Sequence, residues 1–132
     1  MDRIQLAVNG GLMSGMRSNQ AMLDAGGEFL RNDQTAKHYR LWSIDDQFPA
    51  MVQVNKGGAA IALEVWQLTA SGFVAILNRE SVGLSVGKVE LANGERVLGV
   101  IGEPALCEGH KEITEFGNWR AYRESIDRES IE

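Results

Sequence analysis

The sequence has few of the residues that build disulfide frameworks and metal centres. It contains one cysteine, Cys107, and two histidines, His38 and His110, among 132 residues. A single cysteine cannot form a disulfide within the chain, and such usage is typical of a reducing compartment. Metal sites need clustered ligands at defined spacings, which these isolated residues do not provide. We therefore expect no metal, no other cofactor and a cytoplasmic location.

Long apolar runs and an excess of positive charge are also absent. No segment approaches the about 20 apolar residues of a membrane-spanning helix, and the first residues lack the apolar core of a signal peptide. The chain has 13 Lys and Arg against 18 Asp and Glu, whereas nucleic-acid-binding domains usually present a basic face. We expect neither a membrane nor nucleic acid as partner, and the oligomeric state is left open.

The residues that are present suit one globular domain. A length of 132 residues with 44% apolar and 23% charged side chains is ordinary for such a domain. We place the domain at residues 1–122 and a charged C-terminal tail, expected to end a helix, at 123–132.

Alternating apolar and polar residues predict several short strands with few helices. The predicted strands are 4–8, 29–30, 39–44, 50–54, 59–68, 84–91 and 97–101, and the predicted helices are 18–25 and 71–78. The apolar phase changes at Gly87, which predicts a β-bulge, and Asn93-Gly94 predicts a hairpin. This pattern favours an α+β fold with a small mixed or antiparallel, barrel-like sheet.

A glycine-rich loop follows the first predicted strand. Its residues are Asn9, Gly10, Gly11 and Leu12, and Ser14-Gly15 follow shortly after them. Glycines let the backbone approach a ligand closely, and successive N–H groups make a concave site for an anion. The spacing fits neither the dinucleotide-binding nor the P-loop glycine motif. We expect a small anionic substrate, bound through a carboxylate, although a plain glycine-rich turn would have the same composition.

Glu80 is the main candidate for proton transfer. It stands seven residues after Phe73 and four after Ile76, so a helix continuing that far places it on the apolar stripe. Partial burial and the negative end of a helix both raise the pKa of a carboxyl group, and such a group can act as acid and base. If the helix ends at Asn78, Glu80 is instead solvated.

Three other polar residues are weaker candidates. Glu64, on a strand face with Ala62 and Trp66, is a second candidate acid. His38 lies at a strand start, which favours an edge position without a chemical role. Cys107 fits a small buried side chain.

Several motifs resemble the γ-glutamylcyclotransferase-like superfamily, and more closely the C-terminal domain of allophanate hydrolases, which has the same fold. The segment 9–15 resembles the Tyr-Gly-(Ser/Thr)-Leu loop motif of the superfamily. The likeness to the allophanate hydrolase domain runs from about Leu6 to Tyr122. Its landmarks are Ser14-Gly15-Met16, Tyr39-Arg40-Leu41, Gly57-Gly58-Ala59-Ala60-Ile61, Glu64-Val65-Trp66, Gly87-Lys88-Val89-Glu90-Leu91, Asn93-Gly94 and the run 113–122.

The resemblance to γ-glutamylcyclotransferases implies an enzyme whose first loop binds a γ-glutamyl group. In that family a glutamate moves a proton while the α-amine of the substrate attacks its own γ-carbonyl, which releases 5-oxoproline. Asn9 to Leu12 match the loop, and Glu80 matches the glutamate. Asn9 stands where the family has tyrosine, so the substrate is left open as a small γ-glutamyl or related acyl-amine compound.

The resemblance to allophanate hydrolase implies two alternatives. That domain is implicated in decarboxylating a carboxylated nitrogen compound made by an amidase partner, using a histidine in the first loop. Leu12 occupies the histidine position here and cannot move a proton. The chain would then be a stand-alone domain that processes or binds carboxylated urea-type intermediates beside an amidase, or a non-catalytic module. As an enzyme it would be an acyltransferase or a lyase.

Overall fold

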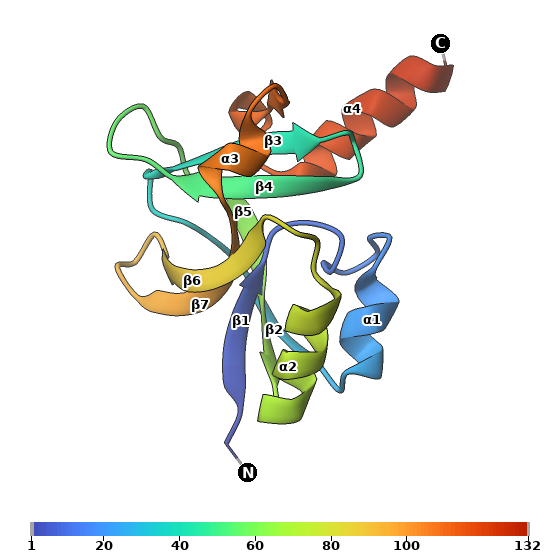
Figure 1. Cartoon of the computed structure of the whole chain (residues 1–132), viewed down its shortest axis with the longest axis vertical. Coiled ribbons are helices and arrows are strands. Elements are labelled where there is room, and N and C mark those ends of the chain that lie inside the picture. The colour runs from blue at the N-terminus through green and yellow to red at the C-terminus, as the bar shows by residue number, and fades with distance from the viewer. Residues whose placement is uncertain (1, 132) are drawn as a thin grey trace.

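The computed structural model of the chain describes residues 2–131 (Figure 1). They contain eight strands, four α-helices and one 3₁₀ helix. The elements are β1 (Ile4–Val8), α1 (Asn19–Asp24), β2 (Glu28–Gln34), β3 (Tyr39–Ile44), β4 (Phe48–Gln53), β5 (Ala62–Leu68), α2 (Ala70–Arg79), β6 (Leu84–Glu90), β7 (Arg96–Gly102), α3 (Pro104–Cys107), β8 (Lys111–Glu112), η1 (Thr114–Phe116) and α4 (Trp119–Ile131). The fold is therefore α+β, as the strand and helix pattern predicts.

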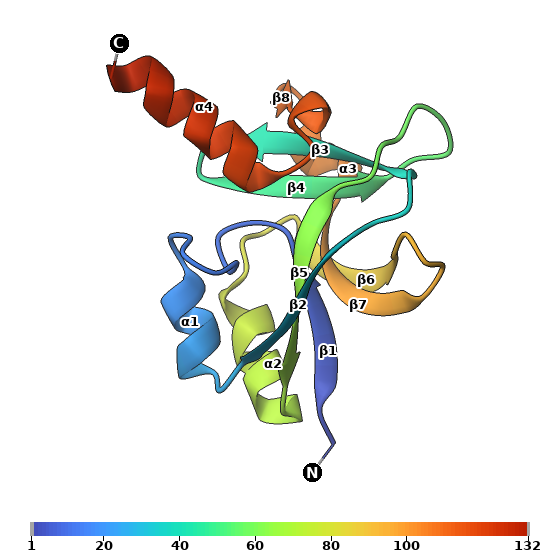
Figure 2. The same ribbon diagram turned by 180° about the vertical axis from the view of Figure 1, so that it is seen from behind.

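The strands form two mixed or antiparallel sheets. The larger has the order β2-β5-β1-β7-β6, in which β1 runs parallel to β7 and antiparallel to β5, and the smaller has the order β4-β3-β8. The smaller sheet lies across one end of the larger sheet, and α1 and α2 lie side by side next to the larger sheet (Figure 1, Figure 2).

The larger sheet curls until its two edge strands touch at one point. A single antiparallel bridge joins Thr35, just after β2, to Leu91, just after β6. Next to it, Ala36 N donates to Glu90 O and Ala92 N donates to Gln34 O, both at 3.0 Å. The described strands do not pair further along these edges, so the sheet is barrel-like without closing into a barrel.

The β-bulge predicted at Gly87 is wrong. β6 and β7 pair without a register shift from Leu84–Gly102 to Glu90–Arg96, and Gly87 lies opposite Gly99. The apolar phase changes although the pairing is regular, because residues of both phases contact apolar side chains. Leu84 and Val86 are partly buried against the main core, Leu84 also packs against the smaller cluster around Ile44, and Val89 is fully buried in the main core. A register shift occurs instead in β2, between Phe29 and Arg31.

Helix α2 begins one residue earlier than predicted and ends one residue later. Thr69 caps it by accepting a hydrogen bond from Gly72 N at 3.2 Å, which is the usual role of threonine at this position. Ser18 precedes α1, but its side chain makes no capping hydrogen bond. The Asn93-Gly94 hairpin is confirmed, with φ of +89° at Gly94.

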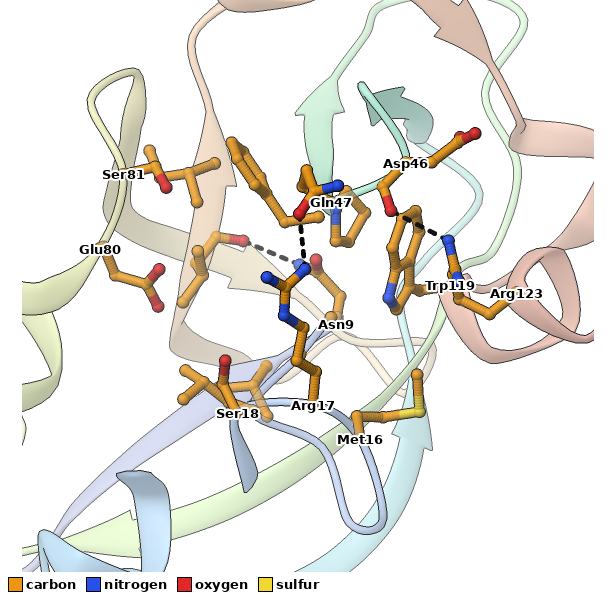
Figure 3. Close-up of a pocket in the computed structure, with 18 of the residues that line it drawn as sticks. Asn9, Met16, Arg17, Ser18, Asp46, Gln47, Glu80, Ser81, Trp119 and Arg123 are labelled. Carbon is orange, nitrogen blue, oxygen red and sulfur yellow. Dashed lines mark hydrogen bonds between the residues drawn. The ribbon is translucent and has the colours of Figure 1, made fainter. Parts of the chain in front are cut away.

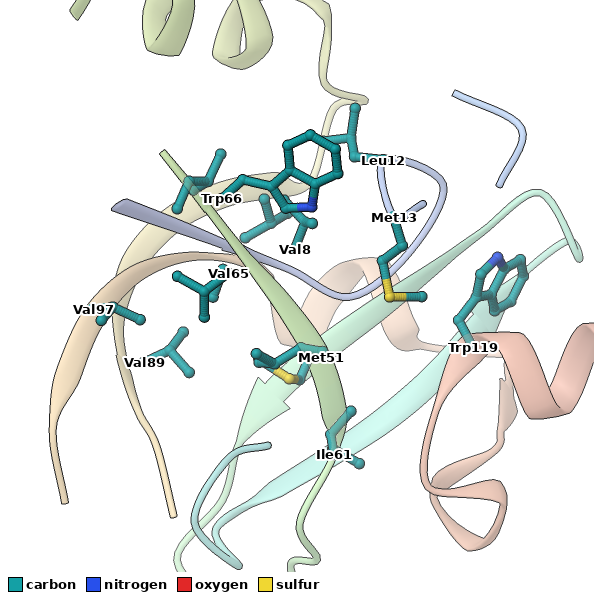
Figure 4. Close-up of a cluster of buried hydrophobic side chains, with 14 of the residues drawn as sticks. Val8, Leu12, Met13, Met51, Ile61, Val65, Trp66, Val89, Val97 and Trp119 are labelled. Carbon is teal, nitrogen blue, oxygen red and sulfur yellow. The ribbon is translucent and has the colours of Figure 1, made fainter. Parts of the chain in front are cut away.

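The core fills the space between the larger sheet, the smaller sheet and the start of α4. Figure 4 shows Val8, Val65 and Val89 gathered inside the larger sheet, with Met51 and Trp119 toward the smaller one. Burial of such side chains is the main favourable contribution to folding. It fixes the end of β1, from which the glycine-rich loop leaves.

The predicted tail continues a helix. Residues 123–131 belong to α4, whose first turns are anchored by the buried Trp119 and Tyr122, and whose far end projects from the body (Figure 1). The boundary at 122/123 therefore falls inside a helix, and residue 132 lies outside the described residues. None of the helices described is long and apolar enough to cross a membrane.

Candidate functional site

A cavity of about 770 Å³ opens where β1 ends (Figure 3). Ligand sites for small molecules commonly have volumes of about 300–1,000 Å³. The main parts of the chain that line it are the loop after β1, the β3–β4 turn, the end of α2 and the start of α4, and β6 and β7 contribute Leu84 and Val100. The lining residues that concern its chemistry are Asn9, Gly10, Gly11, Leu12, Met16, Arg17, Asp46, Gln47, Arg79, Glu80, Ser81, Trp119, Arg123 and Ile126.

The structure brings all five sequence-predicted site residues to this one cavity. Four of them, residues 9–12, form the loop wall, and Glu80 comes from the far end of α2. The loop and Glu80 lie about 70 positions apart in the sequence, and the packing of α2 against β1 and β5 brings them together in space.

The loop leaves several backbone N–H groups free. The carbonyls of Gly10, Gly11 and Leu12 all accept hydrogen bonds from within the loop and the start of α1. The pairs are Gly10 O with Met13 N at 3.1 Å, Gly11 O with Ser18 N at 2.8 Å and Leu12 O with Asn19 Nδ2 at 3.1 Å. The N–H groups of the same three residues have no acceptor within residues 2–131. Adjacent free N–H donors of this kind suit an anion.

Gly10 and Asn9 fix the start of the loop. A Cβ atom at Gly10 would lie 2.5 Å from Cδ of Pro49, so only glycine allows the loop to pack against β4. Asn9 is 4% exposed, and its Nδ2 donates to Val100 O at 2.9 Å. The buried amide is thereby satisfied, and it ties the loop to β7.

Glu80 is the first residue after α2. The helix ends at Arg79, and Glu80 has the extended backbone of a C-cap, so it does not sit on a continuing helical stripe as the spacing predicts. Its burial comes instead from the cavity wall, and Figure 3 shows its carboxyl group directed toward the side of Asn9 and Arg17. No described residue forms a hydrogen bond or an ion pair with this carboxyl group.

Burial raises the pKa of Glu80 above its ordinary value. Desolvation is the larger effect, and the neighbouring Arg79 opposes it by favouring the charged form. A carboxyl group with a raised pKa and no protein partner is available to exchange a proton with a ligand.

Several basic and polar side chains of the cavity were not among the predicted site residues. Arg17 Nη1 donates to Gln47 Oε1 at 2.6 Å, which links the loop to the β3–β4 turn. Arg123 Nη1 donates to the backbone oxygen of Asp46 at 3.0 Å, which links that turn to α4. Arginine is a good partner for carboxylates. Arg17 and Arg123 lie far apart in the sequence, so no periodic pattern links them. Arg17 does, however, directly follow the Ser14-Gly15-Met16 motif.

Asp46 is held in its ionised form. Its Oδ1 accepts hydrogen bonds from Ser43 Oγ at 2.6 Å and from Tyr122 OH at 2.7 Å. These two bonds lower the pKa of Asp46 below its ordinary value, the one from Ser43 most. The pKa of Asp46 is therefore shifted in the opposite direction to that of Glu80.

The other sequence candidates lie outside this cavity. Glu64 is 2% exposed and borders a separate, smaller hollow. His38 is exposed, and Cys107 is buried, which raises the pKa of its thiol. Residues 2–131 contain no group of three or more His, Cys, Asp or Glu side chains arranged to hold a metal ion.

Comparison with known proteins identifies relatives of the whole chain. The family model of the allophanate hydrolase C-terminal domain matches residues 4–124. Urea amidolyase of Saccharomyces cerevisiae is 29% identical over 95% of the chain, which spans only 7% of that protein's length.

Solved structures agree with this result. A protein specific to uropathogenic Escherichia coli is 51% identical, with a TM-score of 0.92 over 94% of this chain and 98% of the other. Kluyveromyces lactis allophanate hydrolase is 28% identical, with a TM-score of 0.89 over 96% of this chain and 22% of the other.

A more distant structure shows how widely the fold is shared. An AIG2-like protein from Mus musculus has a TM-score of 0.62 at 16% identity, over 80% of each chain. It has the γ-glutamylcyclotransferase-like fold that the loop motif predicts. The chain belongs to the allophanate hydrolase C-terminal domain family and has the fold of the γ-glutamylcyclotransferase-like proteins.

Proposed function

We propose that the chain is a γ-glutamylcyclotransferase-like enzyme acting on a small γ-glutamyl or related acyl-amine compound. The N–H groups of Gly10, Gly11 and Leu12 bind a carboxylate of the substrate, and Glu80 transfers the proton. The observation that carries the proposal is that one cavity is lined by Glu80, whose carboxyl group has no hydrogen bond or ion pair within the described residues, and by Gly10, Gly11 and Leu12, whose N–H groups have no acceptor there.

The reaction needs one group that accepts and then donates a proton. The substrate's amine nitrogen attacks its own γ-carbonyl carbon, a C–N bond forms, and Glu80 accepts the proton released from that nitrogen. When the bond to the leaving amine breaks, Glu80 gives the proton to the leaving nitrogen and returns to its ionised form. The products are 5-oxoproline and a free amine.

The apparatus is small because the attack is intramolecular. Holding two reacting groups together removes most of the entropic cost of their encounter. One positioned acid/base group then contributes about 10²–10⁴-fold, and a raised pKa of Glu80 makes its carboxylate a better base. Arg17 and Arg123 add positive charge to the cavity, which favours an anionic substrate.

The test is release of 5-oxoproline from γ-glutamyl-methylamide. Glu80→Gln keeps the size of the side chain but cannot transfer a proton, so we expect kcat to fall by about 10²–10⁴-fold. Glu108→Gln is the matched control, because Glu108 is exposed and lies outside the cavity. Full activity of a folded Glu80→Gln variant would refute the role of Glu80.

A second candidate is a domain that processes or binds carboxylated urea-type compounds beside an amidase. Family membership supports it, since in Kluyveromyces lactis the equivalent region is part of a longer allophanate hydrolase. Leu12 occupies the position of the histidine that the allophanate hydrolase domain uses, and leucine cannot transfer a proton, which argues against the same chemistry. A thermal-shift panel separates the two: stabilisation by ureido acids, and none by γ-glutamyl amines, would favour the second candidate.

The third candidate function is that of a non-catalytic module. It would have no need for a carboxyl group with a raised pKa beside free N–H donors, so the cavity argues for catalysis. The absence of turnover and of thermal stabilisation across both substrate classes would favour the module.

A further inference from the structure

Glu64 is a buried carboxylate that the proposed reaction does not use. Its side chain is 3% exposed, and a buried charge is costly unless donors surround it. Oε1 accepts three hydrogen bonds, from Ser14 N at 2.8 Å, from Ser14 Oγ at 3.1 Å and from Trp66 Nε1 at 3.0 Å. Two of these donors belong to Ser14, which lies in the same connection between β1 and α1 as the glycine-rich residues 9–12.

Arg120 completes the same cluster from α4. Its Nη2 lies 3.4 Å from Glu64 Oε2 and donates to the backbone oxygen of Ser14 at 2.6 Å. The N–H and the C=O of one loop residue are thus held by a carboxylate and a guanidinium that also pair with each other. Such charge-assisted bonds are stronger than neutral ones.

The place of Glu64 in β5 explains what the cluster does to the loop. Glu64 pairs in register with Val8, the last residue of β1, so it lies beside the point where the loop begins. Ser14 lies farther along the loop, one residue before Gly15 with its φ of +74°. Glu64 therefore holds the outer part of the loop back onto the strand pair from which the loop leaves.

We propose that Glu64 is a positioning residue. Through Ser14 and Arg120 it holds the loop in the conformation that presents the N–H groups of Gly10, Gly11 and Leu12 to the cavity. The effect on turnover rests on the proposed function, whereas the effect on the loop does not.

The test uses the ¹⁵N-labelled full chain with three substitutions. Glu64→Gln places an amide nitrogen among the donors of Arg120 or Ser14, and Ser14→Ala removes only the hydroxyl bond at an exposed residue. Glu124→Gln is the control, because Glu124 borders the same hollow and, within residues 2–131, no hydrogen bond or ion pair joins its side chain to residues 9–15. The readouts are hydrogen exchange of Ser14 N–H, the amide resonances of residues 10–12, and KM and kcat with γ-glutamyl-methylamide.

For Glu64→Gln we expect exchange of Ser14 N–H to accelerate about tenfold or more, because a bond to a charged acceptor is lost. The chemical shifts of the amide resonances of Gly10, Gly11 and Leu12 should also change. KM should rise, and the pH profile of kcat should stay unchanged because Glu80 is intact. Ser14→Ala should cause smaller changes in the same direction, and it carries the test if Glu64→Gln does not fold.

Two outcomes would overturn the proposal. One is a folded Glu64→Gln variant, or Ser14→Ala in its place, whose loop resonances and Ser14 exchange match the unmodified chain. The other is an equal change in Glu124→Gln. If the loop responds as expected while the unmodified chain turns over no γ-glutamyl compound, the positioning role stands and the proposed function fails.

Discussion

At the scale of single residues, the sequence predicts the partial burial of Glu80, although not for the reason that applies, and its role in proton transfer stays a proposal. Its spacing from Phe73 and Ile76 suggests a helical stripe, but the helix ends at Arg79 and the cavity wall buries the side chain only in part. Arg17 and Arg123 were not predictable, because their place depends on contacts with a turn at residues 46 and 47. Periodicity reports which face of an element is buried, and it does not report contacts between loops.

The raised pKa of Glu80 predicts a pH-dependent effect on stability. Between the ordinary pKa and the raised pKa the folded state binds more protons than the unfolded state, so stability falls as pH rises through the folded pKa. Glu80→Gln removes this cost. The variant should therefore melt at a higher temperature than the unmodified chain at neutral pH, and the difference should disappear at about pH 4, below the ordinary pKa of glutamate.

Thermal melts followed by circular dichroism at both pH values measure this effect. Glu108→Gln serves as the control, since no comparable burial acts on that exposed side chain. A Glu80→Gln variant that melts lower than the unmodified chain at neutral pH would show that burial does not disfavour the carboxylate.

At the scale of elements, most predicted strands and both predicted helices are present in the structure, because alternation and capping residues are local signals. β1 and β3 have the predicted bounds, and β7 is an interior strand of the larger sheet. The bulge predicted at Gly87 is wrong because residues of both phases of β6 have apolar contacts, which gives the same apolar pattern as a register shift. The α+β class could be predicted from the elements, whereas the order of the strands in the two sheets could not.

Gly99 should be intolerant of a side chain. A Cβ atom there would lie 2.6 Å from Val89 Cγ2 and 3.2 Å from Ala7 Cβ. Gly99→Ala should destabilise the fold by about 1–3 kcal/mol, as overpacking usually does. Urea unfolding measures the loss, and adding Val89→Ala should recover part of it if the two sites are coupled. Unchanged stability of Gly99→Ala would contradict the close packing of β7 between β1 and β6.

At the scale of the whole molecule, the cavity wall is formed by segments from distant parts of the sequence, such as the β3–β4 turn and α4. Asp46 accepts a hydrogen bond from Tyr122, 76 residues away, and so joins the β3–β4 turn to α4. Asp45 and Asp46 both have positive φ, 53° and 58°, a conformation that asparagine also tolerates. The sequence shows the two aspartates ending a strand, but it does not show that α4 returns to them.

Asp46→Asn should weaken the link between the turn and α4 while preserving the turn. The lowered pKa of Asp46 means that its stabilisation is present above the ordinary pKa and is lost as pH falls through the folded pKa. Because the side chain is exposed, we expect a loss below about 1 kcal/mol at neutral pH. Urea unfolding at neutral and acid pH measures it, with Asp45→Asn as the control. An equal loss in both variants would contradict a specific role for Asp46.

A crystal structure of the Glu80→Gln variant with γ-glutamyl-methylamide tests most directly whether the cavity is a catalytic site. The proposed function predicts a substrate carboxylate within hydrogen-bond distance of the N–H groups of Gly10, Gly11 or Leu12, and the scissile amide beside residue 80. A substrate bound elsewhere, or in the cavity with its scissile amide remote from residue 80, would contradict it.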